Sequence, residues 1–394
     1  MTGRSLCIAL FSDSALPVLN GVSVSIETLV RELRSRGHRV HVFTTRYPGH
    51  VDDDPNTHRF RSVQTPLWRG FPLAVPPFYP MLREFRRQRF DIVHTHTPFT
   101  VGFVGLRWAE SHEIPIVSTY HTHYDKYSYY LPLAPKRYLR YKIAKHLNFY
   151  YNRVGQVVTP SEASKRWLLR HSVHTPITVV PTGVPAPRMI GRSEARDALG
   201  FSPQKRVLLF AGRIAREKNV ALLVKAIAIA LKEMPQIEFV LVGDGPARAQ
   251  YRALARDLGI GDHVRFVGAV KRSEMDRYYA ASDLFVFSSM TETQGLVVAE
   301  AMSYGLPALV VQGGGAGEAV KDGVNGFVLR NEPASFARSV LRVLEDDALH
   351  ARLAEGARAT GRESSIARMT DSVLEVYSRA LELGHRPQRE HANV

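Results

Sequence analysis

The segment 283–302, DLFVFSSMTETQGLVVAEAM, places a strand, a loop and a helix in direct succession. DLFVFSS is a short apolar run typical of a buried strand, and the residues after Gly295 follow a helical pattern. Glu292 lies in the loop and Glu300 lies in the helix. Buried strands that lead into helices indicate a parallel sheet covered on both faces.

The same alternation runs through both halves of the chain. In the first half, the strand-like stretches are SLCIALFS, HRVHVFTT, DIVHTH, PIVSTYH and GQVVTPS. In the second half, they are RVLLFAGR, IEFVLVGDG, VRFVGAV, DLFVFSS and PALVVQ. We therefore predict two doubly wound, Rossmann-like α/β domains that face each other across a cleft.

The segment 181–191, PTGVPAPRMIG, is rich in proline and glycine and is the best candidate for a linker. It divides the chain into an N-terminal domain, 1–183, and a C-terminal domain, 184–365. An amphipathic helix at 366–384 is expected to pack back on the first domain, and the tail 385–394 is expected to be disordered.

The composition is typical of a soluble globular protein. The chain has 394 residues, of which 45% are hydrophobic and 23% are charged, as in soluble globular proteins. No run reaches the roughly 18 apolar residues of a membrane span, and the N-terminus does not have the pattern of a signal peptide. The single cysteine, Cys7, excludes an intrachain disulfide and suits the cytoplasm.

The net charge of +15 is unevenly distributed. Residues 1–186 hold 24 Lys and Arg against 12 Asp and Glu, whereas the remainder holds 28 against 25. The basic half points to an acidic partner, which could be a membrane surface, a nucleic acid or a phosphorylated substrate. A general contribution to solubility is the alternative.

The loop and helix of the opening segment suit a nucleotide sugar. Ligands of such sheets bind beyond the carboxyl ends of the strands, where Glu292 lies. The helix N-terminus near Gly295 suits a phosphate, and glycine allows the backbone to approach it closely. Glu292 can accept hydrogen bonds from hydroxyls on one side and Glu300 from hydroxyls on the other. The alternative is an unrelated loop acid and a solvated helix acid.

The segment TETQGLVVAEAMSYGLP resembles the signature of retaining family 4 glycosyltransferases of the GT-B fold, in which seven residues separate two glutamates. AGRIAREKNV resembles their arginine–lysine segment, and PVLNGVSVSIETL resembles their N-terminal glycine loop. VGDGP and VRFVGAV fall where the family has comparable stretches. The resemblance covers most of the chain.

This resemblance implies a set of site residues. Glu292 would contact hydroxyls of the donor sugar, Glu300 the ribose, and His121 would lie beside the donor sugar. Arg213 and Lys218 would hold the diphosphate, with Gly21 close to it. The donor-binding set is Gly21, Arg213, Lys218, Gly243, Val270, Glu292, Thr293, Gln294, Gly295, Leu296 and Glu300, and the catalytic set is His121, Arg213, Lys218 and Glu292.

Arg213 and Lys218 also make chemical sense without the resemblance. They follow the strand RVLLFAGR and can stabilise a departing diphosphate electrostatically without a metal. We therefore expect no metal and no cofactor. The alternative is that both are ordinary solvated surface charges.

Two His-x-His pairs, His94 with His96 and His121 with His123, end predicted strands, with Asp125 nearby. They raise the alternative of a zinc or iron site and a metal-dependent hydrolase. We expect His94, His96 and His123 to line the cleft or to be satisfied polar residues.

Two loops carry further candidate residues. The Asp-x-Asp motif within Asp52 to Asp54 resembles metal motifs of other glycosyltransferases, but it is interpreted as a solvated acidic loop. The run Gly313 to Gly317 departs from the proline-containing form common in the family and is interpreted as a flexible cleft loop.

The segment from Lys126 to Ser161 has seven basic residues and no acid. Basic residues interleaved with tyrosines on a helix are typical of a helix that lies on an anionic membrane, and a surface helix docked on the sheet is the alternative. The segment 118–132, STYHTHYDKYSYYLP, resembles the sequences of bacterial diacylglycerol glucosyltransferases.

The expected protein is a retaining, metal-independent hexosyltransferase. It would move glucose from UDP-glucose to diacylglycerol or another glycerolipid, in the cytoplasm and peripherally on the inner face of the cell membrane. A phosphatidylinositol-type acceptor and a soluble sugar or alcohol are alternatives. A nucleic-acid binder is the remaining rival, although the chain lacks an RNA motif or a zinc finger.

Overall fold

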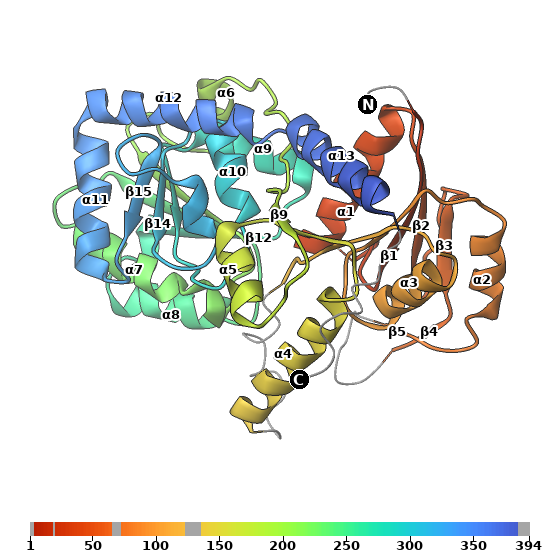
Figure 1. Ribbon diagram of the computed structural model, residues 1–394. Coiled ribbons are helices and arrows are strands. Elements are labelled where there is room, and N and C mark those ends of the chain that lie inside the picture. The colour runs from red at the N-terminus through yellow and green to blue at the C-terminus, as the bar shows by residue number, and fades with distance from the viewer. Residues whose placement is uncertain (1–3, 19, 65–71, 123–134, 385–394) are drawn as a thin grey trace. The chain divides into compact units, whose positions relative to one another are not determined.

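A computed structural model describes residues 4–18, 20–64, 72–122 and 135–384. The chain divides into two compact units (Figure 1). The first unit contains Met1–Gly183 and Ile366–Val394, and the second contains Val184–Ser365.

The first unit is built on a seven-stranded parallel sheet. The strands, in their order across the sheet, are β3 (Thr57–Phe60), β2 (Arg39–Thr45), β1 (Cys7–Ser12), β6 (Ile92–Thr95), β7 (Ile116–Thr119), β8 (Gln156–Thr159) and β9 (Ile177–Val179). A short antiparallel pair joins β4 (Ser62–Val63) to β5 (Leu73–Ala74). The helices are α1 (Gly21–Ser35), α2 (Tyr79–Arg86), α3 (Thr100–Ser111), α4 (Lys136–Tyr151), α5 (Glu162–Arg170) and α13 (Ile366–Leu383).

The C-terminal helix α13 belongs to the first unit although it follows the second unit in sequence. It lies beside α1, and both helices cover the same face of the sheet (Figure 1). Arg36 donates a hydrogen bond of 2.5 Å to Asp371 on α13. The buried residues Val373, Val376 and Tyr377 of α13 pack in this layer of the core.

The second unit is built on a six-stranded parallel sheet. Its strands, in their order across the sheet, are β12 (Val264–Gly268), β11 (Ile237–Val242), β10 (Arg206–Ala211), β13 (Leu284–Phe287), β14 (Ala308–Val311) and β15 (Gly326–Leu329). Its α-helices are α6 (Arg192–Leu199), α7 (Val220–Ala230), α8 (Arg248–Asp257), α9 (Arg272–Ala281), α10 (Leu296–Ser303), α11 (Pro333–Glu345) and α12 (Asp347–Glu363). Its single-turn 3-10 helices are η2 (Arg216–Lys218), η3 (Gly261–His263) and η4 (Ala316–Ala319).

Both sheets have the doubly wound order. In each, the chain first adds strands on one side and then returns to the middle to add strands on the other side. The two middle neighbours are β1 and β6 in the first unit and β10 and β13 in the second. Ligands of doubly wound sheets bind beyond the carboxyl ends of these neighbours, because the loops diverge there.

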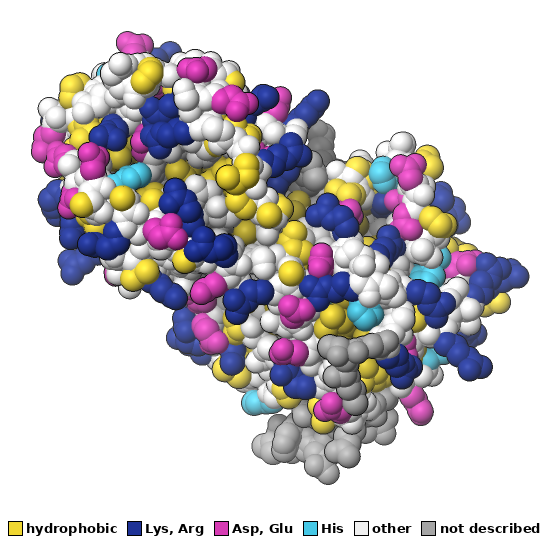
Figure 2. Space-filling model, turned by 90° about the horizontal axis from the view of Figure 1, so that it is seen from above, with side chains coloured by type: hydrophobic (Ala, Val, Ile, Leu, Met, Phe, Trp, Pro, Cys, Tyr) yellow, Lys and Arg dark blue, Asp and Glu magenta, His cyan; other side chains and the backbone are white. Residues whose placement is uncertain are grey.

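Within the described part of the chain, no helix is both long and apolar enough to cross a lipid bilayer. The surface carries many Lys and Arg side chains, with Asp and Glu among them on the face that Figure 2 displays.

Candidate functional site

The best-defined cluster of the second unit lies where β10 and β13 end. The Nζ atom of Lys218, the last residue of η2 in the connection after β10, forms an ion pair with Oε1 of Glu292, in the loop after β13. The Ser289 hydroxyl donates a hydrogen bond of 3.0 Å to the same oxygen of Glu292, and the Ser288 hydroxyl donates one of 2.7 Å to the Lys218 carbonyl. These contacts join the two loops at the position where the sheet topology predicts a ligand.

Arg213 lies in the same loop as Lys218 and is half exposed. Its guanidinium forms an ion pair with Glu217, whose side chain is only 8% exposed. Each of the two predicted diphosphate-binding cations therefore has a carboxylate partner within its own unit. A diphosphate that binds here would have to share these cations with Glu217 and Glu292.

Glu300 is held differently from Glu292. It lies in the second turn of α10 and is 8% exposed. Arg272 Nη1 donates to its Oε1 at 2.6 Å, and the Tyr279 hydroxyl donates to its Oε2 at 2.9 Å. Burial, reinforced by the Glu300 carboxylate, raises the pKa of Tyr279, so this phenol stays protonated and donates.

Gly295 is the N-cap of α10, as the sequence predicted, and it has no side chain to occupy the first-turn N–H groups. Its φ of +75° lies in the left-handed region that favours glycine, and a Cβ atom here would lie 2.7 Å from the Cβ of Ala316. Leu296 is the first residue of the helix, and Thr293 and Gln294 lie half-buried in the preceding loop. No side chain therefore caps this helix end, and uncapped N–H groups of this kind can bind a phosphate.

Two other predicted donor-binding residues border the ends of neighbouring strands. Gly243 follows β11 with φ +137°, and a Cβ atom there would lie 2.0 Å from the Gly212 carbonyl oxygen. Val270 lies half-buried before α9 and packs against the core of the second unit. The Gly313 to Gly317 loop is also fixed in place, because the Gly315 N–H donates to the Glu292 carbonyl at 2.7 Å.

In the first unit, Gly21 is the first residue of α1 and is exposed. The N-cap Asn20 accepts hydrogen bonds from the N–H groups of Val22 and Ser23 at 2.9 and 3.0 Å. Among the described residues, a Cβ atom added at Gly21 would meet no atom within 4 Å. The described atoms therefore leave space beside the capped start of the helix.

His121 follows β7 and contacts His96, which follows β6, with 2.9 Å between Nε2 of His121 and Nδ1 of His96. Burial lowers the pKa of His121 to about 4, so the ring is neutral at neutral pH. Gly21 and His121 lie in the first unit, whereas the other predicted site residues lie in the second.

Only part of the predicted metal alternative lies within the described residues. Both ring nitrogens of His94 are engaged, Nδ1 with the Tyr377 hydroxyl and Nε2 with the Thr119 hydroxyl, each at 2.7 Å. Across the described ranges, no group of three or more His, Cys, Asp or Glu side chains could hold a metal ion. His123 and Asp125 lie outside the described residues, as do the tail 385–394 and most of the tyrosine-rich text before α4.

The interpretation of Asp52 to Asp54 as a solvated acidic loop was wrong for two of the three residues. Asp52 accepts two hydrogen bonds from the Arg59 guanidinium, at 2.5 and 2.6 Å. Asp54 accepts from Arg34 at 2.9 Å and from the Thr57 hydroxyl at 2.8 Å. Arg59 also donates to the Leu16 carbonyl at 2.8 Å, so Asp52 helps to fix the segment that leads to Gly21.

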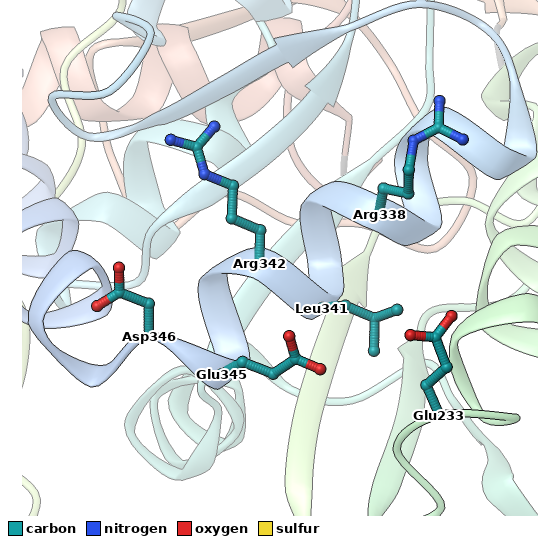
Figure 3. Close-up of a pocket in the computed structure, with 6 residues that line it drawn as sticks. All are labelled: Glu233, Arg338, Leu341, Arg342, Glu345 and Asp346. Carbon is teal, nitrogen blue, oxygen red and sulfur yellow. The ribbon is translucent and has the colours of Figure 1, made fainter.

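A separate open hollow of about 600 Å³ lies on the second unit along α11 (Figure 3). Its lining consists of Glu233, Arg338, Leu341, Arg342, Glu345 and Asp346. Arg338 and Arg342 extend to the same side of α11 (Figure 3). The hollow shares no residue with the predicted site.

Comparison with protein families identifies the chain. The model "Glycosyltransferase Family 4" matches residues 19–188, and the model "Glycosyl transferases group 1" matches residues 191–360. The chain belongs to the family 4 glycosyltransferases. The glycosyltransferase family inferred from the two-glutamate segment is therefore confirmed.

Two relatives carry the same name, alpha-monoglucosyldiacylglycerol synthase. The protein from Streptococcus pneumoniae is 34% identical over 77% of this chain and 70% of its own length. The protein from Acholeplasma laidlawii is 31% identical over 82% of this chain and 85% of its own length. A D-inositol 3-phosphate glycosyltransferase from Thermobispora bispora is 30% identical over 95% of this chain and 93% of its own length.

Solved structures confirm the predicted GT-B fold. Sucrose-phosphate synthase from Thermosynechococcus elongatus superposes with a TM-score of 0.78 at 21% identity, over 97% of this chain and 100% of that one. WaaG, a glycosyltransferase of lipopolysaccharide biosynthesis, superposes with a TM-score of 0.69 at 18% identity, over 94% of this chain and 99% of that one.

Proposed function

We propose that this glycosyltransferase moves glucose from UDP-glucose to diacylglycerol or another glycerolipid, with retention of configuration at the anomeric carbon. The observation that carries the proposal is the Lys218–Glu292 ion pair beside the α10 N-terminus. It places a cation suited to a diphosphate next to a carboxylate suited to sugar hydroxyls, at the switch point of the second sheet.

In the proposed reaction, the acceptor hydroxyl attacks the anomeric carbon from the face that the diphosphate leaves. The bond from the anomeric carbon to the diphosphate oxygen breaks, and the bond to the acceptor oxygen forms. The hydroxyl proton passes to the departing diphosphate, whose charge Arg213 and Lys218 stabilise. Because these two cations supply the positive charge, we propose that a divalent metal is dispensable.

The lipid acceptor is supported by the names of the two relatives and by helix α4. Its exposed basic side chains alternate with exposed aromatic ones, of which Tyr138 is 56% exposed and Tyr141 is 60% exposed. Leu147 and Tyr150 are buried against the first unit and anchor the helix there. An anchored helix with a basic and aromatic outer face suits the surface of an anionic membrane, so we propose peripheral attachment to the cytoplasmic leaflet.

The test is sugar transfer over a panel of nucleotide sugars, with acceptors presented in vesicles of graded anionic lipid content. Charge reversal of Arg137, Arg140 and Lys145 to glutamate should weaken vesicle binding by a few kcal/mol, because each basic residue near the surface contributes roughly 1 kcal/mol. Hydrolysis of the donor should be nearly unchanged, and binding of the unmodified protein should fall as salt rises.

The matched control reverses three exposed basic residues of the second unit, Lys232, Arg256 and Arg338, which changes the net charge equally. This variant should bind vesicles as the unmodified protein does. Binding that ignores lipid charge would reject the membrane role of α4. The proposed acceptor would be rejected if the enzyme used inositol phosphate, phosphatidylinositol or a soluble alcohol in place of diacylglycerol. Inositol phosphate should be assayed first, because the Thermobispora bispora relative is named a D-inositol 3-phosphate glycosyltransferase.

A further inference from the structure

Three histidines line up at the carboxyl ends of β6 and β7 in the first unit. His94 and His96 are 0% and 2% exposed, and their ring centroids are 4.1 Å apart. The rings of His96 and His121 are stacked, with centroids 5.2 Å apart and planes inclined by 22°. Only His121 follows from the family resemblance as a site residue, so the role of its neighbour His96 is open.

The contact between His96 and His121 restricts the protons on both rings. Burial lowers the pKa of His121 to about 4 and the pKa of His96 well below its ordinary value. Both rings are therefore neutral at pH 7, and each carries one N–H. The 2.9 Å contact between Nδ1 of His96 and Nε2 of His121 requires that one of these nitrogens donates and the other accepts.

The second ring nitrogen of His96, Nε2, shows whether His96 or His121 donates the hydrogen bond between them. Among the described residues, Nε2 of His96 is buried and has no hydrogen-bond partner. If His121 donated, the single proton of His96 would lie on this Nε2 as an orphaned N–H, which is rare in protein interiors. If His96 donates from Nδ1, Nε2 carries only a lone pair, and the proton of His121 must lie on Nδ1.

We propose that His96 is a positioning residue, which donates from Nδ1 to Nε2 of His121 and so fixes the proton of His121 on Nδ1. His121 then acts as a hydrogen-bond donor towards an oxygen of the donor sugar, and it does not act as the base that takes up the acceptor proton. This inference rests on the proposed function and on the family resemblance, which implies that His121 lies beside the donor sugar.

The test combines nitrogen NMR of histidine-labelled protein with kinetics. In the unmodified protein, the His121 resonances, assigned by their loss in His121→Ala, should show the Nδ1–H tautomer. His96→Phe removes the donor, so His121 should change tautomer and kcat should fall about 5-fold or more. His96→Asn places an amide donor near the former Nδ1 and should retain both the tautomer and most of the activity.

A second histidine pair of the same unit provides the control. His41 and His58 contact each other at 3.2 Å between ring nitrogens, and their rings are stacked 5.5 Å apart on β2 and β3. His41→Phe makes the same chemical change outside the predicted site and should leave kcat and the His121 tautomer unchanged.

The outcomes separate this proposal from the proposed function. An Nε2–H tautomer of His121 in the unmodified protein, or a tautomer that His96→Phe does not alter, overturns the proposal even if the Phe variant is poorly folded. A changed tautomer with unchanged kcat overturns the positioning role. Failure of the unmodified protein to transfer any sugar would reject the proposed function, whereas the NMR result would still decide the proton positions.

Discussion

The two units present different side chains at the carboxyl ends of β6 and β7 in the first unit and of β10 and β13 in the second. In the first unit, His94 and His96 are buried and His121 is half-buried, and the three neutral rings are bonded to one another or to hydroxyls. In the second unit, Lys218 and Glu292 form an ion pair. Neutral rings can orient a sugar without adding charge, whereas paired charges can exchange partners with a diphosphate. The two kinds of cluster should therefore respond differently to pH and to substitution.

The largest expected effect is on the stability of the first unit in acid. Burial lowers the pKa of His121 to about 4 and of His94 to about 3, from 6.5. Below pH 6.5 the unfolded chain therefore binds more protons than the folded unit, and folding stability falls as the pH falls. Each such histidine contributes about 1.4 kcal/mol per pH unit until its folded-state pKa is approached.

Hydrogen exchange between pH 7 and 4.5, corrected for intrinsic rates, measures this loss. Protection of β6 and β7 should fall more than protection of β10 and β13, because the histidines with lowered pKa lie in the first unit. His94→Asn should make the pH dependence shallower, although it lowers stability at pH 7. Equal loss in both units would contradict the comparison.

The second expected effect concerns the cations of the second unit. Arg213→Ala and Lys218→Ala should each lower kcat by about 100-fold or more, as when one preorganised charge-stabilising group is removed. Lys225→Ala, an exposed lysine on α7, is the matched control and should keep wild-type kinetics. Activity should persist in a chelator, and a requirement for magnesium or manganese would reject the metal-free scheme.

The strands predicted from the sequence and the strands missed by that prediction lie at different positions in the two sheets. The ten predicted strands form the interior of both sheets and the β12 edge, where apolar runs are long enough to detect. The three missed strands of the two large sheets, β3, β9 and β15, are all edge strands. They are less buried than the interior strands, so their hydrophobic pattern is too weak to distinguish from a loop.

A similar limit applies to the candidate site. Residues within one loop, such as Glu292 and Gly295, could be chosen from sequence because the strand before them and the helix after them are clear. The partners of Glu300 and His121 could not be chosen from sequence. Arg272 lies 28 positions before Glu300, and His96 lies 25 positions before His121. Strand pairing brings His96 to His121, and the packing of α9 beside α10 brings Arg272 to Glu300. Spacing along the chain encodes neither.

The smallest expected effects compare the two glutamates. Glu292→Gln should lower kcat roughly 10- to 100-fold, because an amide accepts hydrogen bonds from sugar hydroxyls more weakly than a carboxylate. Glu300→Gln should chiefly raise the KM for the donor, because Glu300 is proposed to contact the ribose. Steady-state kinetics with varied donor measure both quantities, and wild-type values for both variants would reject the interpretation of this segment.

Tyr279→Phe tests the role of Glu300 more specifically, since it removes one of the two hydrogen-bond donors to the Glu300 carboxylate. The variant loses the 2.9 Å hydrogen bond to Oε2 while Arg272 keeps its bond to Oε1. The donor KM should therefore rise about 5-fold, as expected for about 1 kcal/mol, with kcat nearly unchanged. Tyr278→Phe, on the same helix and half-buried, is the control and should leave KM unchanged. If Tyr279→Phe lowers thermal stability but not donor affinity, the orientation of Glu300 does not limit ribose binding, and Tyr279 serves only the packing of α9 on α10.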